Sequence, residues 1–226
     1  MNALGYATAR TEATQALTDD TFDVVSELLA LSAVPASGTA TAHTGTWTKV
    51  TGGFRAATGV TSFKYVFSEE EQKYNTLTLR LTNGRVSTSY DSYYSIQLGH
   101  DTLHSSTYGT IYEQWTWSGA GVHGSAAGYV GPAFSYPDLG NAVTTATGDA
   151  SSVTIILTGL RSPFSKPIFA HPFSVKAGCF QYLAYATATG LTEPVNVLEM
   201  FNGDPGTYNF ATQDAFISLT FSDKIE

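Results

Sequence analysis

The chain has a single cysteine, Cys179, among its 226 residues, and it also lacks long apolar runs and clusters of basic residues. One cysteine excludes an intrachain disulfide. Because no apolar stretch approaches the roughly 20 residues that span a bilayer, the sequence predicts no membrane anchor. The first twenty residues show no basic segment followed by an apolar one, so we expect synthesis in the cytosol without a secretory signal.

Charge is scarce as well. Charged residues make up 13% of the chain, against roughly 25% in an average soluble domain. The 11 Lys and Arg residues are outnumbered by 19 Asp and Glu residues, which gives a formal net charge of −8. This balance disfavours binding to nucleic-acid phosphates and to anionic membrane surfaces. We therefore expect a surface that interacts through neutral hydrogen bonds and aromatic contacts.

Residues 1–45 read as an N-terminal arm, one short helix and a linker. Residues 1–17 show no periodicity, whereas residues 20–32 place apolar side chains at helical spacing. Asp20 is a suitable N-cap for this helix, and acidic residues occupy its first turn, where the helix dipole favours them. The linker "VPASGTATAHTG" follows. The apolar face predicted as an assembly surface consists of Phe22, Val25, Leu28 and Leu29.

From residue 46 to residue 226 the pattern is that of β-strands. Short runs rich in β-branched and aromatic residues alternate with turn-forming clusters, among them "SFKYVF", "TLTLRLT", "TIYEQWTW", "SVTIILTGL" and "AFISLTF". Asn83 and Gly84 predict a type I′ hairpin turn, which needs two residues at positive φ. About ten strands without helices between them predict a mainly β protein, with residues 46–226 forming one antiparallel, jelly-roll-like β-sandwich.

Residues 118–150 are the least regular part of this region. They are rich in Gly, Ala and Tyr and are too long for an ordinary connection between strands. We expect a functional loop, an interface loop or a partly disordered segment here. Because depletion of charge with enrichment of aromatic residues is typical of interface cores, we also expect this segment to contribute contacts in a homo-oligomer.

The segment "HDTLHSSTYGTIYEQWTWSG" raises the question of a metal site. His100 and His104 have the i, i+4 spacing of zinc ligands on a helix, but Asp101 stands where zinc peptidases have a glutamate. The flanking patterns are those of strands, and in an extended chain the two imidazoles lie too far apart to share a metal. We therefore predict no metal site and no cofactor.

The enzymatic alternatives have weaker support in the residues. No G-x-S-x-G motif occurs, and Cys179 lies in an apolar run without a neighbouring base or cation that would activate its thiol. Jelly-roll glycosidases use two carboxylates among aromatic side chains, so Glu113 and Glu199 form the pair to consider. The sequence lacks the longer motifs of those enzymes, and we predict no catalytic residues.

Tyrosines crowd the middle of the chain, and buried phenols need hydrogen-bond partners, so some of these rings are expected at the surface. Rigid aromatic rings beside Ser and Gly are typical of recognition surfaces. In "TIYEQWTW" we expect Trp115 and Trp117 to pack inward while Tyr108 and Tyr112 face outward. The predicted interaction surface consists of Tyr108, Tyr112, Tyr129 and Tyr136.

An N-terminal arm, one helix and a Thr/Ser/Gly/Ala-rich β-sandwich with few charges together resemble the virion structural proteins of tailed bacteriophages. The resemblance lies in composition and layout and implies a capsid decoration protein or a head, tail or fibre component, which has no enzymatic activity. It implies assembly in the host cytoplasm, incorporation into the virion, contacts with other virion proteins, and a homotrimer. A carbohydrate-binding or receptor-binding module that contacts a host-surface glycan is the alternative hypothesis, and a jelly-roll glycosidase is the third.

Overall fold

The computed structural model describes residues 34–57, 59–84, 92–103, 108–118, 121–134, 138–142, 151–174, 180–188, 191–202 and 215–225. The chain divides into two units at residue 34, and the sheets described below belong to the second unit, residues 35–226. The predicted helix 20–32, with Phe22, Val25, Leu28 and Leu29, lies outside the described residues. Within the described ranges, no helix has the length and apolarity required to cross a membrane.

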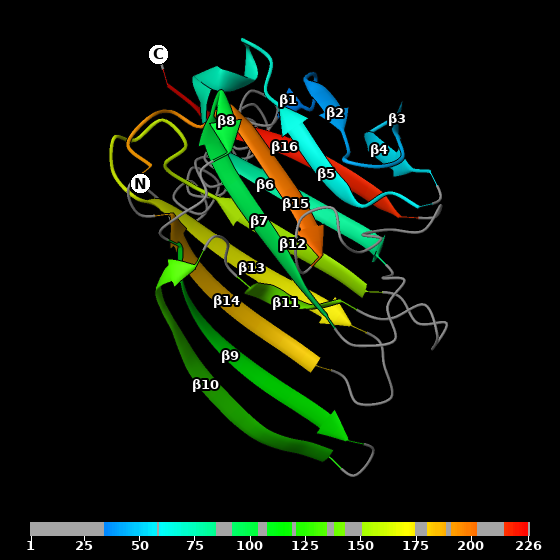
Figure 1. The fold of residues 1–226 in the computed structure, drawn as a ribbon, viewed down its shortest axis with the longest axis vertical. Helices are drawn as coiled ribbons and strands as arrows, with labels where there is room; N and C mark the ends of the chain where they lie inside the picture. Colours follow the sequence, from blue (N-terminus) through cyan, green and yellow to red (C-terminus); the bar gives the residue numbers. More distant parts are fainter. Residues whose placement is uncertain are drawn as a thin grey trace, which may run out of the picture. The chain divides into compact units, whose positions relative to one another are not determined.

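The larger of two antiparallel sheets has the strand order β10-β9-β14-β13-β12-β6-β16-β4-β3 (Figure 1). Several neighbours in this order are also neighbours in the sequence, so they form hairpins, whereas β6 lies between the distant strands β12 and β16. The strands are β3 (Trp47–Val50), β4 (Gly53–Ala56), β6 (Tyr74–Gly84), β9 (Tyr108–Ser118), β10 (Gly121–Phe134), β12 (Ser151–Leu157), β13 (Lys166–Ser174), β14 (Phe180–Ala188) and β16 (Phe216–Lys224).

The smaller sheet has the order β11-β7-β15-β5-β2, with β8 paired to β7. Its central strand β15 joins β5 on one side and β7 on the other, both antiparallel. The strands are β2 (Thr39–Thr41), β5 (Ser62–Val66), β7 (Ser92–His100), β8 (Thr102–Leu103), β11 (Asp138–Ala142) and β15 (Val197–Asn202). The short strand β1 (Val34–Pro35) and the 3-10 turn η1 (Glu71–Lys73) complete the described elements.

The core lies between the two sheets. Phe63 and Tyr65 of β5 contact Phe54 of β4, with both pairs of ring centroids 5.7 Å apart. Phe63 also meets the ring of Trp47 edge to face at 5.0 Å. Alternation along β6 places Leu77, Leu79 and Leu81 in the same core, where all three are fully buried. The predicted antiparallel β-sandwich is therefore confirmed.

A buried carboxylate joins β2 to the β5–η1 corner. The side chain of Glu71 is completely buried, and its Oε1 accepts hydrogen bonds from the Tyr65 hydroxyl at 2.6 Å and the Ser37 amide at 2.6 Å. The Gly38 amide donates to the same oxygen at 3.2 Å, and the Ser68 amide donates to Oε2 at 2.6 Å. Burial, and secondly the bond to Glu71, raises the pKa of the Tyr65 hydroxyl. Four donors thus compensate the desolvation of one carboxylate.

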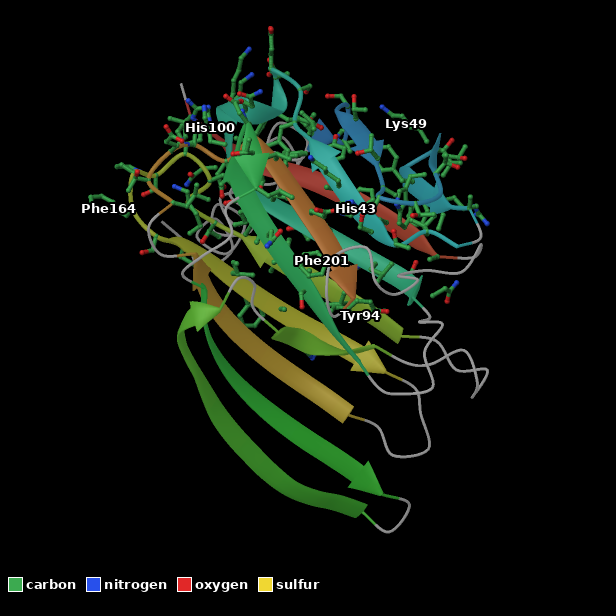
Figure 2. The ribbon with its side chains drawn as sticks, viewed as in Figure 1. His43, Lys49, Tyr94, His100, Phe164 and Phe201 are labelled. Atoms are coloured by element: carbon green, nitrogen blue, oxygen red, sulfur yellow. The ribbon has the colours of Figure 1, made fainter. Side chains whose placement is uncertain are left out.

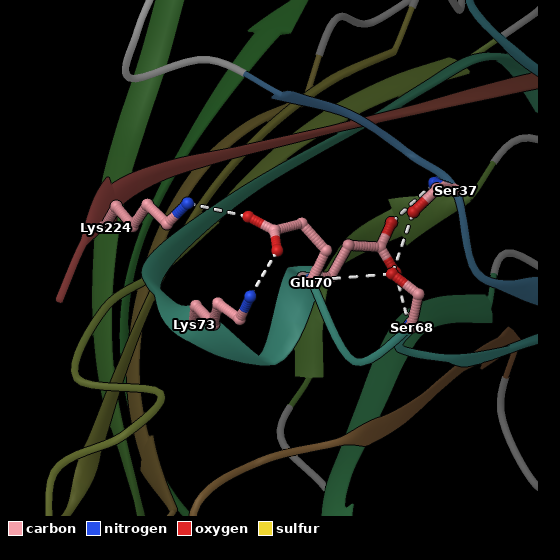
Figure 3. Close-up of polar contacts among 6 residues, drawn as sticks. Ser37, Ser68, Glu70, Lys73 and Lys224 are labelled. Carbon is pink, nitrogen blue, oxygen red and sulfur yellow. Dashed lines mark hydrogen bonds and ion pairs between the residues drawn. The ribbon is translucent and has the colours of Figure 1, made fainter. Parts of the chain in front are cut away.

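The neighbouring Glu70 lies at the surface and makes a different set of contacts. Its Oε1 receives Nζ of Lys224 at 2.7 Å, and its Oε2 receives Nζ of Lys73 at 2.5 Å (Figure 3). The hydrogen bonds from Lys224 and then Lys73 lower the pKa of Glu70 to about 2. This exposed network connects η1 to the end of β16.

Three sequence-based expectations about chain connections require correction. The predicted type I′ turn is wrong: only Asn83 has positive φ, at 55°, while Gly84 still belongs to β6 and pairs with Ser151 of β12. The segment 118–150, expected to be a loop, contributes β10 and β11. The sandwich also begins before the predicted boundary at residue 46. Strand β2 lies within the expected linker and pairs with β5.

Candidate interaction surfaces

The loop 158–165, called the Phe164 loop below, connects β12 to β13 and is held in one shape by its own hydrogen bonds. The Ser162 amide donates to the Gly159 carbonyl at 2.9 Å, and the Phe164 amide donates to Oγ of Ser162 at 3.1 Å. Gly159 has a φ of 67°, a conformation that favours glycine. Hydrogen bonds within the loop and the backbone conformation of Gly159 therefore define its turn.

Lys166 supports this loop from inside. Its side chain is fully buried, and its ammonium group donates to the carbonyl of Ser162 and, at 3.2 Å, to the carbonyl of Phe164. No carboxylate among the described residues forms an ion pair with it. Burial lowers the pKa of the Lys166 ammonium group, because desolvation disfavours the charged form. The two carbonyl bonds fix the backbone on both sides of Pro163.

Hydrogen bonds also tie the Phe164 loop to the rest of the sandwich. The backbone carbonyl of Asn75 accepts the Leu160 amide at 3.0 Å, and its side-chain Oδ1 accepts the Arg161 amide at 3.2 Å. The Leu160 carbonyl in turn accepts the Val195 amide at 2.8 Å. These hydrogen bonds therefore connect the loop to Asn75 at the start of β6 and to the segment that precedes β15.

The turn between β7 and β8 belongs to the same network. Asp101, at a φ of 58°, and Asn196 bond reciprocally: the Asp101 amide donates to Asn196 Oδ1 at 2.7 Å, and Asn196 Nδ2 donates to Asp101 Oδ1 at 2.8 Å. Nδ1 of His100 lies 2.7 Å from the Pro194 carbonyl, and the Asn196 amide donates to the Gly99 carbonyl at 3.0 Å. Three connections between strands thus form one hydrogen-bonded end of the sandwich.

Phe164 is the prominent apolar side chain of this end. It is 76% exposed, the largest exposed fraction among the large hydrophobic residues whose side chains the structure describes. Figure 2 shows its ring pointing away from the strands. Two other residues of the same loop, Arg161 and Pro163, are also exposed. Sequence reasoning missed this surface, because Gly159 and the Ser162-Pro163 pair read as an ordinary turn between two strands.

The second candidate surface is the edge strand β10. It pairs antiparallel with β9, and no strand of the described chain pairs with its other edge. Its fourteen residues contain no Asp, Glu, Lys or Arg. The register shifts between His123 and Ser125 and again between Val130 and Phe134, which leaves a regular stretch at residues 125–130. Unpaired edges of this kind are templates for pairing with another strand.

The predicted tyrosine surface is distributed over two strands. Tyr108 and Tyr112 lie in β9, and Tyr129 lies in β10 opposite Ile111, whereas Tyr136 falls outside the described residues. Tyr112 pairs with Ala184 of β14 in the sheet register. The structure describes the backbone of these strands and not their side chains, so the outward orientation of the tyrosines and the inward orientation of Trp115 and Trp117 stay predictions.

The two carboxylates considered for a glycosidase lie in two different sheets. Glu113 lies in β9 of the larger sheet and Glu199 in β15 of the smaller one. Glu199 pairs with Lys64, whose neighbours Phe63 and Tyr65 contact the larger sheet, so Glu199 occupies the opposite face of its sheet. The fold therefore does not place these two positions on facing surfaces.

Glu199 instead meets His43. Its side chain is 2% exposed, and Oε1 lies 3.0 Å from Nε2 of the half-exposed His43, within the range of an ion pair. Within the described part of the chain, the same oxygen accepts no hydrogen bond of good geometry, and Oγ of the buried Ser95 makes none. Among the described residues no group of three His, Cys, Asp or Glu side chains gathers as a metal site would require, and His104 lies outside these residues.

Comparisons with known proteins give little guidance. No protein-family model and no curated protein sequence matches this chain. Among solved structures, the CBM2 module of the evolved Dit protein of Lactobacillus casei BL23 phage J-1 is 10% identical, with a TM-score of 0.26 over 86% of this chain and 92% of that one. The binding domain of botulinum neurotoxin DC in complex with SialylT is 12% identical, with a TM-score of 0.25 over 84% of this chain and 44% of that one. At these TM-scores neither structure bears on the function of this chain.

Proposed function

We propose that this chain is a non-enzymatic structural protein of a bacteriophage virion, of the capsid decoration or of the head, tail or fibre type, and that it acts by binding other virion proteins. The observation that carries the proposal is the Phe164 loop, which holds a 76% exposed aromatic ring on a hydrogen-bonded support. The low charge and the layout of the chain, which resemble such proteins, support the same assignment.

The rigidity of the loop matters for binding. A flexible side chain or loop loses conformational entropy when a partner orders it, and this loss reduces affinity. The carbonyls of Ser162 and Phe164 are already fixed by Lys166, so the backbone that carries the ring is preformed. Aromatic anchors that enter a pocket on the partner commonly contribute most of the binding energy of a protein interface.

The polar groups of the loop favour a protein partner over a glycan. Oγ of Ser162 accepts the Phe164 amide, the oxygens of Asn75 accept two loop amides, and the Lys166 ammonium group faces the inside of the loop. These groups are used within the fold and are not available to sugar hydroxyls. What the loop presents is an exposed apolar ring, with the exposed Arg161 three residues before it in the sequence, and this combination suits an apolar pocket with an acidic rim.

The test is to locate the protein in particles of the phage or prophage that encodes it. Quantitative mass spectrometry of purified particles should find the wild-type chain at a fixed copy number. Phe164→Ala should reduce its incorporation severalfold, while the folded domain keeps its thermal midpoint. Phe169→Ala is the matched control, because Phe169 is another exposed phenylalanine, at 40%, but lies within strand β13.

Three outcomes would contradict the proposal. Absence of the wild-type chain from complete particles would remove the structural role. Binding to a glycan array that is lost in Phe164→Ala would favour the carbohydrate-binding alternative. Hydrolysis of a polysaccharide by the wild type, abolished by Glu113→Gln without loss of folding, would show that the protein is an enzyme.

A further inference from the structure

We propose that two copies of this chain associate by pairing their β10 strands edge to edge and antiparallel, so that the larger sheet continues from one subunit into the other. β10 is the terminal strand of that sheet, drawn in dark green in Figure 1. In the described chain its only sheet partner is β9. Every second residue of an edge strand directs its backbone N–H and C=O groups away from the sheet, where another strand satisfies them.

The other edge strands of the two sheets are much shorter than β10, so a second copy of β10 is the partner that matches it best in length. The larger sheet ends on its far side at β3, which has four residues and carries the exposed Lys49. The smaller sheet ends at β2, with three residues, and at β11, with five residues and the charged Asp138. None of these matches the fourteen residues of β10. A second β10 is therefore the one described edge of comparable length.

Self-pairing also requires that identical side chains tolerate one another, because a two-fold axis places like residues close together. Like charges opposite each other across two strands are destabilising. The regular stretch of β10, residues 125–130 with the sequence SAAGYV, contains no ionisable side chain apart from the Tyr129 phenol. Pro132, which cannot donate to a ladder, lies beyond this stretch inside the second register shift. The pairing zone therefore coincides with residues 125–130.

This contact has two-fold symmetry and builds a dimer. It differs from the homotrimer implied by the resemblance to virion proteins, since an isologous contact between two edges closes after two copies. The contact does not depend on the Phe164 loop, which connects other strands. It holds whether or not the protein is part of a virion, so its failure and the failure of the proposed function are separate results.

Light scattering on the full chain gives the first test. The wild type should have twice the mass of one chain, whereas Ala126→Lys and Ala127→Lys should weaken dimerisation, because each places two like charges within the short pairing zone around the two-fold axis. Thr48→Lys is the matched control, since Thr48 is exposed in the short edge strand β3 and already neighbours a lysine. Circular dichroism should show unchanged strand content in all three variants.

A cysteine scan tests the register. In a Cys179→Ser background, single cysteines are placed in turn at residues 125–130 and oxidised under mild conditions. Directly opposed residues of antiparallel strands have Cα atoms about 4.5–5.5 Å apart, a distance that a disulfide can bridge. Only the residue on the two-fold axis lies opposite its own copy, so one position should cross-link several times faster than the others.

The proposal is overturned by any of three results. The wild type could be a monomer throughout the concentration range of the scattering experiment. The protein could form a multimer whose mass is the same in both folded β10 lysine variants. Cross-linking could also proceed at similar rates at all six positions, which would indicate random encounters between exposed thiols and not a paired edge.

Discussion

The hydroxyl of Tyr65 donates a hydrogen bond of 2.6 Å to the carboxylate of Glu71, and both side chains are fully buried. The same carboxylate oxygen also accepts the Ser37 amide. An amide in place of the carboxylate would offer a single acceptor oxygen and would set its own donors against the existing ones. We expect Glu71→Gln to lower the free energy of unfolding by about 1–3 kcal/mol, measured by urea denaturation.

Glu70 provides the control for this prediction, because it is adjacent in sequence but exposed. Glu70→Gln should lower the free energy of unfolding by less than Glu71→Gln does, because solvent screens the ion pairs of this exposed carboxylate. Equal effects of the two substitutions would mean that the buried network around Glu71 does not stabilise the fold. Tyr65→Phe should destabilise by about 1 kcal/mol, because it removes one of the four donors.

Gly38 occupies a position that has no room for a side chain. A Cβ atom here would overlap the Val66 carbonyl oxygen and would lie 2.7 Å from Glu71 Oε2 and 2.8 Å from the Tyr65 hydroxyl. Gly38→Ala should therefore destabilise the sandwich by about 1–3 kcal/mol, the usual range for overpacking. Gly52→Ala is the comparison, since no atom lies within 4 Å of the added Cβ and only its φ of 82° opposes it. If Gly52→Ala costs as much as Gly38→Ala, steric overlap is not the cause.

Most strands could be predicted from the sequence, because alternation and β-branched residues mark them locally, whereas β2, β10 and β11 lie in segments expected to be a linker and a loop. Leu77, Leu79 and Leu81 of β6 show this directly: they alternate with polar residues, and all three are buried. The allocation of strands to sheets could not be read in this way. β6 and β7 follow one another in the sequence, which suggested a hairpin at Asn83 and Gly84, yet they belong to different sheets.

The interaction surfaces depend on relationships that a local pattern does not contain. Nothing around Lys166 shows that its ammonium group is buried under the Phe164 loop, because the carbonyls that it binds belong to residues with ordinary turn preferences. The edge position of β10 likewise results from the order of the whole sheet. Composition did indicate the sparse charge of residues 118–150, but it could not distinguish a loop from an uncharged strand.

The pKa of Glu70 gives a prediction about pH. The ion pairs with Lys224 and Lys73 lower this pKa to about 2 in the folded state, below the value of about 4.3 for an unperturbed glutamate. The stabilisation is therefore present above the unfolded value and is lost as the pH falls toward 2. Titration by NMR should show the low pKa directly, and 1 M salt should raise it, because salt screens exposed charges. A pKa that is unchanged by salt and by Lys224→Met would exclude these ion pairs as the cause.

Lys166 predicts a pH dependence of the same sign in a higher pH range, because its pKa is also lowered in the folded state. Burial lowers the pKa of its ammonium group in the folded state, so that between this pKa and the unfolded value of about 10.4 the unfolded chain binds more protons. Stability linked to Lys166 therefore rises with pH across that interval. The free energy of unfolding of the wild type minus that of Lys166→Met should increase from neutral to alkaline pH. Contributions from the tyrosines cancel in this difference, since both proteins contain them.

Lys49→Met serves as the control for this measurement, because Lys49 is exposed in β3, and its difference from the wild type should stay flat with pH. Hydrogen exchange adds a local readout. Lys166→Met leaves the carbonyls of Ser162 and Phe164 without their ammonium donor, so the amides of the Phe164 loop should exchange faster while those of β12 do not. A stability difference that falls as the pH rises, or loop amides as protected as before, would show that Lys166 does not hold Phe164 in place.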